Sequence, residues 1–232
     1  KLILELDPTF HPGTYNLALE QSSRNAIDAL TSGSATVVEK IVVKEGMRLN
    51  AIIKLISDKT GLDKSELTRL ADDESLWHLP SGAPSLEGYL FPATYSFSPD
   101  ITAKQALMSM RVRMDEEIAK FQIPEKDIHR VLTIAGLVQK EARIEADFYK
   151  VSSVFQNRLA KGMKLQSDAT VSYGVNGTTV STSAADRAND NPYNTYLHVG
   201  LPAGPISSPG SATAKARRCL LRRAKGSRDW AR

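Results

Sequence analysis

The chain is poor in the residues that build covalent and metal cross-links. It has one cysteine, Cys219, and four histidines among 232 residues. A single thiol excludes an internal disulfide and a cysteine-based zinc cluster, and the histidines form no HExxH-type pair. We therefore expect neither a metal site nor a cofactor.

Long apolar runs are also lacking. No stretch reaches the roughly 18 apolar residues that a helix needs to span a bilayer, and the opening KLILEL is far too short. With 41% hydrophobic and 24% charged residues, the composition is that of a soluble globular protein with one large domain or two small ones.

The formal charge of +4 is unevenly distributed. Residues 217–232 carry seven Lys or Arg and one Asp, a net of +6, so the other 216 residues sum to −2. Because the body is slightly acidic, nucleic acid is not expected as a partner. A basic tail can bind phosphates or anionic lipid headgroups, but a solvated segment without fixed structure is the commoner meaning of such a composition.

Two strand-and-helix units are predicted before residue 80. Residues 1–35 combine a strand at 2–6 with an amphipathic helix, and residues 36–79 combine a β-branched strand with two helices. In the second unit, Gly61 suits the end of the first helix, and Asp63 or Ser65 suits the start of the next. The stretch VKEGMRLNAIIKLISDKTGLDKSEL resembles a LysM module, a small glycan-binding fold of cell-wall proteins. A βαα unit that only packs against its neighbour fits the same pattern.

The pattern then changes. Residues 80–99 are rich in Pro, Gly, Ser and aromatic residues, which predicts an extended, linker-like segment lying against a surface. Three helices are expected next, at 101–121, 126–142 and 147–161. Asp147 suits the start of the third helix and Gly162 its end. Polar loops and short extended pieces follow, so the predicted class is α+β with a mainly helical C-terminal part.

A carboxylate interrupts the apolar face of the second of these helices. At about 100° per residue, Ile134, Leu137, Val138 and Glu141 fall within one stripe. Partial burial favours the protonated form of a carboxyl group, which is the form that a general acid requires. Helical spacing therefore makes Glu141 a candidate acid.

The same spacing also fits a structural glutamate. A core carboxylate is often satisfied by a helix N-terminus or by a nearby cation, here Arg143, Lys150 or Arg158. Glu145 lies one turn beyond Glu141, but a helix break before it would remove it from this face, so it is the weaker candidate.

Five motifs occur in the order found in one enzyme family: EGYLFPATYSF, LVQKEA, VFQNRL, GMKLQSDATVSYG and YNTYLHVGLPAGPISSPG. Over about residues 1–215 the chain resembles endolytic murein transglycosylases, bacterial enzymes that cut the glycan strands of peptidoglycan. The resemblance implies that Glu141, in QKE, is the catalytic glutamate of the family motif EKE. The chain departs from the family at Gln139, where relatives often have Glu, and at Ala93, where they often have Asp. Gln139 leaves Glu141 as the proton-transfer group of the motif.

The resemblance implies a lytic reaction that uses one carboxyl group. Glu141 is expected to protonate the oxygen leaving between MurNAc and GlcNAc. As a carboxylate it then accepts the proton of the MurNAc C6 hydroxyl, which attacks C1 and leaves a 1,6-anhydro-MurNAc end. Polar and aromatic side chains of the other motifs suit N-acetyl sugars and are expected to bind substrate: Gln166, Ser167, Asp168, Tyr173, Asn194, Tyr196 and Glu87. For some of them a structural role fits equally well, as a cap for Asp168, a core residue for Tyr196 or a linker anchor for Glu87.

The resemblance also implies a location and partners. We expect a single membrane-spanning anchor before Lys1, with the catalytic part outside the cytoplasm at the plasma membrane. Expected partners are peptidoglycan strands and cell-wall synthases, in the termination of nascent strands. A non-catalytic peptidoglycan-binding or scaffold protein is the alternative. The predicted divisions are 1–35, a LysM-like module at 36–79, a catalytic domain at 80–216 and an atypical basic tail at 217–232.

Overall fold

The computed structural model describes residue 15 and residues 17–32, 38–142, 144–177 and 181–211. The strand predicted at 2–6 and the basic tail at 217–232 lie outside these stretches. Helix α1 (Ser23–Ser32) confirms the amphipathic helix expected in the first unit, and none of its residues is buried. Within the described part of the chain, no helix combines the length and the hydropathy needed to cross a membrane.

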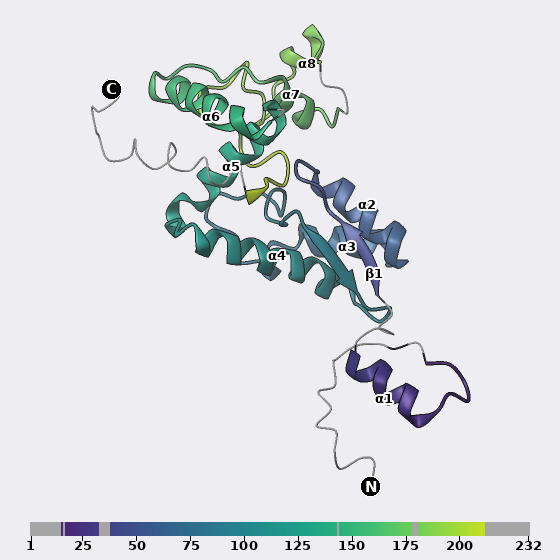
Figure 1. The fold of residues 1–232 in the computed structure, drawn as a ribbon. Helices are drawn as coiled ribbons and strands as arrows, with labels where there is room; N and C mark the ends of the chain where they lie inside the picture. The colour runs from purple at the N-terminus through teal and green to yellow at the C-terminus, as the bar shows by residue number, and fades with distance from the viewer. Residues whose placement is uncertain (1–14, 16, 33–37, 143, 178–180, 212–232) are drawn as a thin grey trace.

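A small antiparallel sheet begins the main body. β1 (Glu39–Val42) pairs with β2 (Thr94–Phe97). Between the strands come α2 (Leu49–Thr60), α3 (Lys64–Asp72) and the 3₁₀ turn η2 (Glu74–Leu76). α2 packs on β1 and on α3, so the unit reads strand, helix, helix, strand (Figure 1).

The local signals in this unit are confirmed. Gly61 follows α2 with a φ of 74°, in the left-handed region that glycine adopts at little cost. The Asp63 carboxylate caps α3, since it accepts the backbone N–H groups of Ser65 and Glu66 at 3.2 Å each. The N-cap residue of α2 is Arg48, whose side chain makes no such bond.

Five helices follow in the described chain: α4 (Ala103–Lys120), α5 (Glu125–Glu141), α6 (Glu145–Ala160), α7 (Asp168–Gly174) and α8 (Ala184–Ala188). The first three confirm the helices expected from the sequence. α7 and α8 lie where polar loops were predicted, because helices of 7 and 5 residues are too short to show an apolar period.

The start of α6 corrects one prediction. Asp147 was expected to cap this helix, but the N-cap residue is Ile144 and the helix begins at Glu145. The carboxylate of Asp147 instead accepts a hydrogen bond from Lys150 at 3.2 Å, three residues along the same helix. The prediction was wrong because an aspartate in the first turn is favourable as a neighbour of the helix N-terminus even when it is not the cap.

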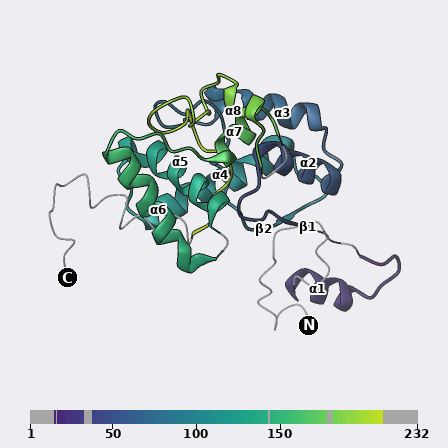
Figure 2. The ribbon, with the colours of Figure 1, turned by 90° about the horizontal axis from the view of Figure 1, so that it is seen from above.

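The elements form a lower and an upper group in Figure 1. The sheet, α2, α3 and α4 make up the lower group, α6, α7 and α8 lie above it, and α5 runs from one to the other. Seen from above, α7 lies over the junction between the α5–α6 side and the α2–α3 side (Figure 2). One apolar core continues through both groups, from Ile41 in β1 to Phe155 in α6.

The segment at 80–99 contributes to this core. Leu86, Tyr89 and Leu90 are each 0% exposed, so this linker-like stretch runs through the interior as well as along a surface. It ends in β2, which pairs with β1 from the other side of the predicted division at residue 80. That division stays a prediction, while the sheet joins the two parts.

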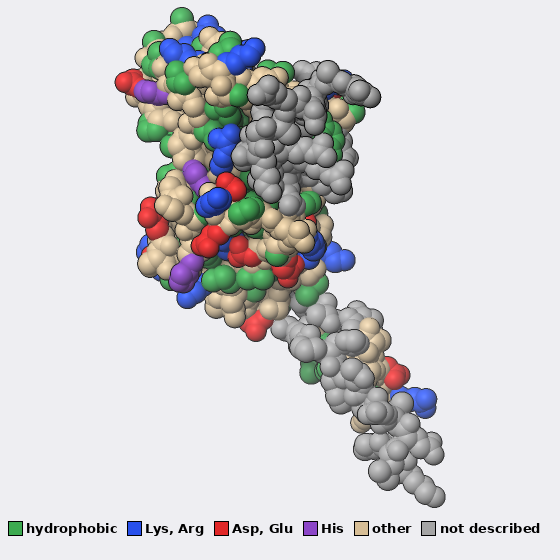
Figure 3. All heavy atoms as spheres, turned by 90° about the vertical axis from the view of Figure 1, so that its left-hand side faces the viewer, with side chains coloured by type: hydrophobic (Ala, Val, Ile, Leu, Met, Phe, Trp, Pro, Cys, Tyr) green, Lys and Arg blue, Asp and Glu red, His purple; other side chains and the backbone are tan. Residues whose placement is uncertain are grey.

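Charge on the visible surface is mixed. On the face drawn in Figure 3, acidic and basic side chains are interspersed over the lower group and do not gather into a patch of one sign. This arrangement agrees with the small net charge of the body, and on this face the lower group shows no basic surface of the kind that follows a nucleic-acid backbone.

Two glycines let the segment at 205–208 pass close to the interior. Gly88 has a φ of 80°, and a Cβ atom there would lie 2.3 Å from the Cβ of Pro205. On α5, a Cβ atom at Gly136 would lie 3.0 Å from the carbonyl oxygen of Ser207. The segment is thereby packed against both the 80–99 stretch and the middle of α5.

We predict that Gly88→Ala costs about 3 kcal/mol of unfolding free energy. About 1–2 kcal/mol comes from the positive φ and the remainder from overlap with Pro205. Gly61→Ala is the matched control, because Gly61 has a similar φ of 74° but open space at its Cβ position. Urea unfolding measures the unfolding free energy of both variants. Equal losses in Gly88→Ala and Gly61→Ala would contradict the close approach of Pro205 to Gly88.

Candidate active site

Glu141 is the last residue of α5, and its side chain is exposed. The preceding members of its stripe, Leu137 and Val138, are 0% and 1% exposed. The expected burial of Glu141 is therefore wrong, because the helix ends there: Ala142 is extended, with φ −93° and ψ 133°. Extrapolating a helical face fails where the chain leaves the helix.

One oxygen of Glu141 is fixed by a hydroxyl group. Ser167 Oγ donates a hydrogen bond to Glu141 Oε1 at 2.5 Å, and Ser167 itself is 4% exposed. Oε2 accepts no hydrogen bond from any residue that the structure describes. Since Oε1 is held as an acceptor, Oε2 is the oxygen open to a proton or to a ligand.

Two of the three cations proposed as structural partners have other contacts. Lys150 pairs with Asp147, and Arg158 Nη1 donates to the backbone carbonyl of Leu165. Arg143 and the side chain of Glu145 lie outside the described part of the structure. The buried, ion-paired glutamate that was the alternative from the sequence therefore does not describe Glu141 and its described neighbours.

Two buried threonines position Ser167. The backbone N–H of Ser167 donates to Thr195 Oγ1 at 3.1 Å, and Thr170 Oγ1 donates to the Ser167 carbonyl at 2.7 Å. The two threonine hydroxyls are 2.8 Å apart, and their side chains are 0–1% exposed. Both lie within quoted motifs, LQSDAT and YNTY, but a threonine in a polar loop gives no signal of this role by itself.

Gln166 precedes this serine in a strained backbone conformation. Its φ is 51°, in the left-handed region, and its backbone N–H donates to the Thr195 carbonyl at 3.0 Å. The Gln166 side chain is exposed and directly precedes Ser167, so a ligand that reaches Ser167 can also contact it. Non-glycine residues in this region are uncommon and often occur at functional sites.

Asp168 and Tyr196 meet at the start of α7. Asp168 Oδ1 accepts hydrogen bonds from Tyr196 at 3.0 Å and from Thr182 Oγ1 at 2.6 Å. Arg187 Nη1 lies 3.9 Å from the same oxygen, with its guanidinium group 5.7 Å from the centre of the Tyr196 ring. Partial burial raises the pKa of Tyr196, and the hydrogen bond to Asp168 raises it further. Both predicted residues keep part of their surface exposed.

Asn194 supports the loop that contains Tyr196. Its side chain is 0% exposed, its Nδ2 donates to the carbonyls of Arg187 and Asn189, and its Oδ1 accepts the backbone N–H of Tyr196. These three bonds occupy both amide donors, so the side chain, as folded, holds loop segments together and presents no open group to a sugar.

Glu87 and Tyr173 form a second, buried group. Glu87 is 3% exposed, and its two oxygens share the backbone N–H of Leu49, at 3.1 and 3.0 Å. Tyr173 on α7 interacts with this carboxyl group, and its ring lies 4.6 Å from that of Tyr193. Burial raises the pKa of Glu87 to about 7, although the Leu49 N–H and nearby Arg48 act in the opposite direction.

The structure thus sorts the predicted residues into three neighbourhoods. Glu141 and Ser167 form one contact, Asp168 and Tyr196 another, and Glu87 and Tyr173 a third. Within the described ranges, no group of three or more His, Cys, Asp or Glu side chains is arranged to hold a metal ion. What Glu141 and Ser167 offer chemically is one carboxyl group with one oxygen fixed by a hydroxyl group and a second that bonds no described residue.

We predict that stability falls by about 3 kcal/mol between pH 4.5 and pH 7 through Glu87 alone. The pKa of Glu87 is raised on folding from 4.5 to about 7, so in this window the folded state holds a proton that the unfolded state has released. Urea unfolding from pH 4.5 to 8 should show this loss in the unaltered protein and a smaller one in Glu87→Gln. Parallel pH curves for the two proteins would contradict it.

Comparison with known proteins gives consistent matches. The chain is 34% identical to an endolytic murein transglycosylase of Bacillus subtilis (strain 168) over 89% of its length and 63% of the relative. It is 32% identical to an endolytic murein transglycosylase of Streptococcus pneumoniae (strain D39) over 85% of its length and 42% of the relative. The chain therefore spans between about two fifths and two thirds of the length of these proteins.

A solved structure and a family model agree with these matches. The crystal structure of a yceG-like protein from Listeria monocytogenes superposes with a TM-score of 0.69 at 31% identity, covering 89% of this chain and 74% of that one. The model of the YceG-like family matches residues 1–218. The chain belongs to the YceG-like family.

Proposed function

We propose that the chain is the catalytic part of an endolytic lytic transglycosylase that cleaves peptidoglycan strands, with Glu141 as general acid and then base. The observation that carries the proposal is the state of the Glu141 carboxyl group: it is exposed, its Oε1 accepts a hydrogen bond from Ser167, and its Oε2 accepts none from the described residues. The names of the similar proteins from Bacillus and Streptococcus support the choice of substrate.

In the proposed reaction, Glu141 Oε2 carries the proton. It transfers this proton to the glycosidic oxygen between MurNAc and GlcNAc as the bond to MurNAc C1 breaks. The resulting carboxylate accepts the proton of the C6 hydroxyl of the same MurNAc while O6 bonds to C1. Bonds and protons balance without water, and the products are a 1,6-anhydro-MurNAc end and a GlcNAc end.

One carboxyl group can serve both proton transfers only if it stays near both the glycosidic oxygen and the C6 hydroxyl oxygen of the substrate. The Ser167 hydroxyl restricts rotation of the carboxyl group, which keeps Oε2 in one direction and reduces the entropy lost at each proton transfer. A retaining hydrolase would need a second carboxylate about 5 Å away. Asp168 is engaged with Tyr196, Thr182 and Arg187, so we assign it to substrate orientation together with Gln166.

The strand-helix-helix-strand order of residues 39–97 agrees with a LysM-like unit that could grip a glycan strand, although a packing role fits equally well. We propose that the protein acts outside the cytoplasm, anchored by a helix before Lys1, and ends the elongation of nascent strands beside cell-wall synthases. The resemblance of the motifs and the names of the relatives support this placement.

We predict that Glu141→Gln abolishes the formation of anhydro-ended products, because an amide cannot donate the proton to the leaving oxygen. A loss of at least about 100-fold is expected for removing a general acid. Glu125→Gln is the matched control, since Glu125 is an exposed glutamate in the first turn of the same helix. Mass spectrometry of purified glycan strands after incubation measures the products.

Two outcomes would overturn the proposal in different ways. Binding of strands with no change in their length, in the unaltered protein, would favour the scaffold alternative. Reducing ends formed with water, identified by incorporation of oxygen from labelled water, would indicate a hydrolase and replace the second proton-transfer step.

We also predict that Ser167→Ala lowers kcat by about 10- to 100-fold, the equivalent of losing one hydrogen bond to a charged group, about 1.5–3 kcal/mol. Ser167→Thr should retain more activity, because it keeps the hydroxyl group. Initial rates on glycan strands measure both variants, and full activity in Ser167→Ala would remove Ser167 from the proposed site.

A further inference from the structure

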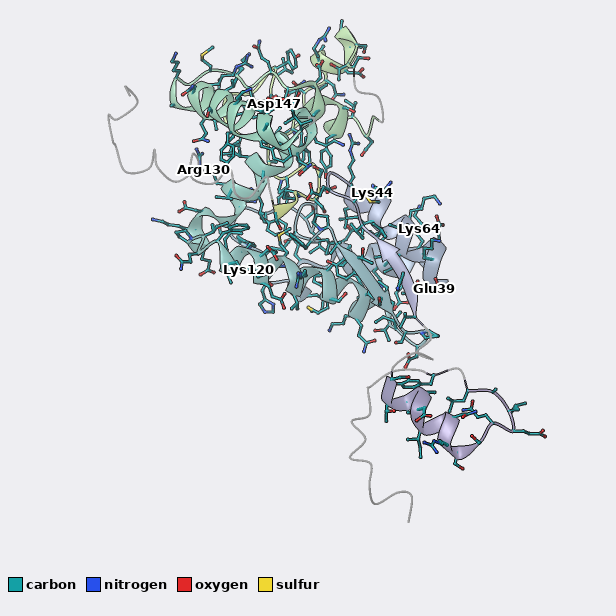
Figure 4. The ribbon with its side chains drawn as sticks, viewed as in Figure 1. Glu39, Lys44, Lys64, Lys120, Arg130 and Asp147 are labelled. Carbon is teal, nitrogen blue, oxygen red and sulfur yellow. The ribbon has the colours of Figure 1, made fainter. Side chains whose placement is uncertain are left out.

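The loop at 44–48 contacts both helices that carry the proposed catalytic pair. It begins at the end of β1 nearest the upper helices, where Figure 4 labels Lys44, while Glu39 marks the opposite end of the strand. The loop is joined to the segment after α8 by two backbone hydrogen bonds, from Gly46 to Ser208 at 2.8 Å and from Ser208 to Met47 at 2.9 Å.

Toward α7, the contact is made by Arg48. Its Nη1 donates to the Gly177 carbonyl at 2.8 Å, its Nη2 donates to Ser172 Oγ at 3.4 Å, and its guanidinium group lies 5.2 Å from the centre of the Tyr173 ring. A planar guanidinium group that donates twice and stacks on a ring fixes both the position and the rotation of the helix end it contacts.

Toward α5, the contact is made by Lys140. This residue directly precedes Glu141, and its Nζ donates to the Gly46 carbonyl at 3.3 Å. Partial burial lowers the pKa of Lys140, and Arg48 lowers it further. The buried carboxyl group of Glu87 interacts with both cations. The charge of Arg48 favours the ionised form of Glu87, and the charge of Glu87 favours the ionised form of Lys140.

We propose that Arg48 and Glu87 are positioning residues that hold α7 so that Ser167 contacts Glu141, which makes the chemistry of the C-terminal part dependent on the N-terminal unit. This inference rests on the proposed function of Glu141. Neither residue is proposed to touch the substrate. Their effect passes through Ser172 and Tyr173 at one end of α7 to Ser167 at the other.

The length of α7 makes this transmission direct. The helix has 7 residues, and Ser167 is its N-cap residue. At 1.5 Å per residue, Tyr173 lies about 9 Å along the axis from Ser167, so the helix is too short to bend and absorb a displacement. Of the two threonines that hold Ser167, Thr170 belongs to α7 and Thr195 to the loop at 191–196. The same loop contacts Tyr173 through the ring of Tyr193.

A double-mutant cycle between Arg48→Ala and Ser167→Ala tests the proposal. In the unaltered background, we expect Arg48→Ala to lower kcat about tenfold with little change in KM. In the Ser167→Ala background it should cause at most about a twofold further loss, because the contact that it supports is already absent. Lys54→Ala is the matched control, because Lys54 is a cation within α2, the helix that follows Arg48, and its ion pair with Asp58 is exposed.

Hydrogen exchange supplies a readout that requires no turnover. The amides of α7 should exchange faster in Arg48→Ala and in Glu87→Gln than in Lys54→Ala. Arg48→Lys, which keeps the charge but not the paired donors, should recover part of the protection. If Arg48→Ala is too unstable to purify, Arg48→Gln, which retains one donor group, takes its place in the cycle.

The outcomes separate this inference from the proposed function. Equal losses from Arg48→Ala in both backgrounds, or unchanged exchange in α7, would overturn the positioning role while leaving Glu141 as the acid. Full activity in Glu141→Gln would overturn the proposed reaction, yet faster exchange in α7 would still show that Arg48 and Glu87 hold the helix.

Discussion

A buried carboxyl group connects the parts of this structure. Glu87 has almost no exposed surface, and a carboxyl group in that position is tolerated only with close polar partners. Its partners are the first N–H of α2, the hydroxyl of Tyr173 on α7, and the charge of Arg48. Because these come from residues 48–49 and from α7, the contacts of one side chain join the N-terminal unit to α7. The same contact satisfies the first N–H of α2, because the side chain of the N-cap residue Arg48 makes no capping hydrogen bond to this helix.

The arrangement of the proposed catalytic pair, Glu141 and Ser167, depends on this connection. Ser167 reaches Glu141 only if α5 and α7 keep their relative positions, and the loop at 44–48 contacts both of them. The segment at 205–208 holds the loop at 44–48 by two backbone hydrogen bonds. It can pack there because Gly88 and Gly136 have no side chains. Packing and hydrogen bonding of these segments together determine the orientation of the Glu141 carboxyl group.

Sequence reasoning succeeded where the cause is local. Gly61 ends one helix and Asp63 begins the next through contacts within four residues, and the long helices show their period directly. It failed for the environment of Glu141, because the end of α5 depends on what the following residues contact. The bond between Glu87 and Leu49 spans 38 residues and that between Ser167 and Thr195 spans 28, and no local pattern encodes either pairing. The motifs named the candidate residues but not the contacts between them.

The departure at Gln139 now has a physical explanation. Three consecutive residues at the end of α5 contact three different segments: Gln139 Oε1 accepts the backbone N–H of Gly210, Lys140 donates to Gly46, and Glu141 accepts from Ser167. An amide oxygen serves the first contact as well as a carboxylate would, so Gln in place of Glu preserves the anchor and removes a negative charge beside the proposed acid. Ala93 is tolerated for a similar reason, since its contact with Val43 is made by its backbone carbonyl at 2.9 Å. Both substitutions spare the contacts that orient Glu141, and on this basis they are compatible with an active site that uses a single carboxyl group.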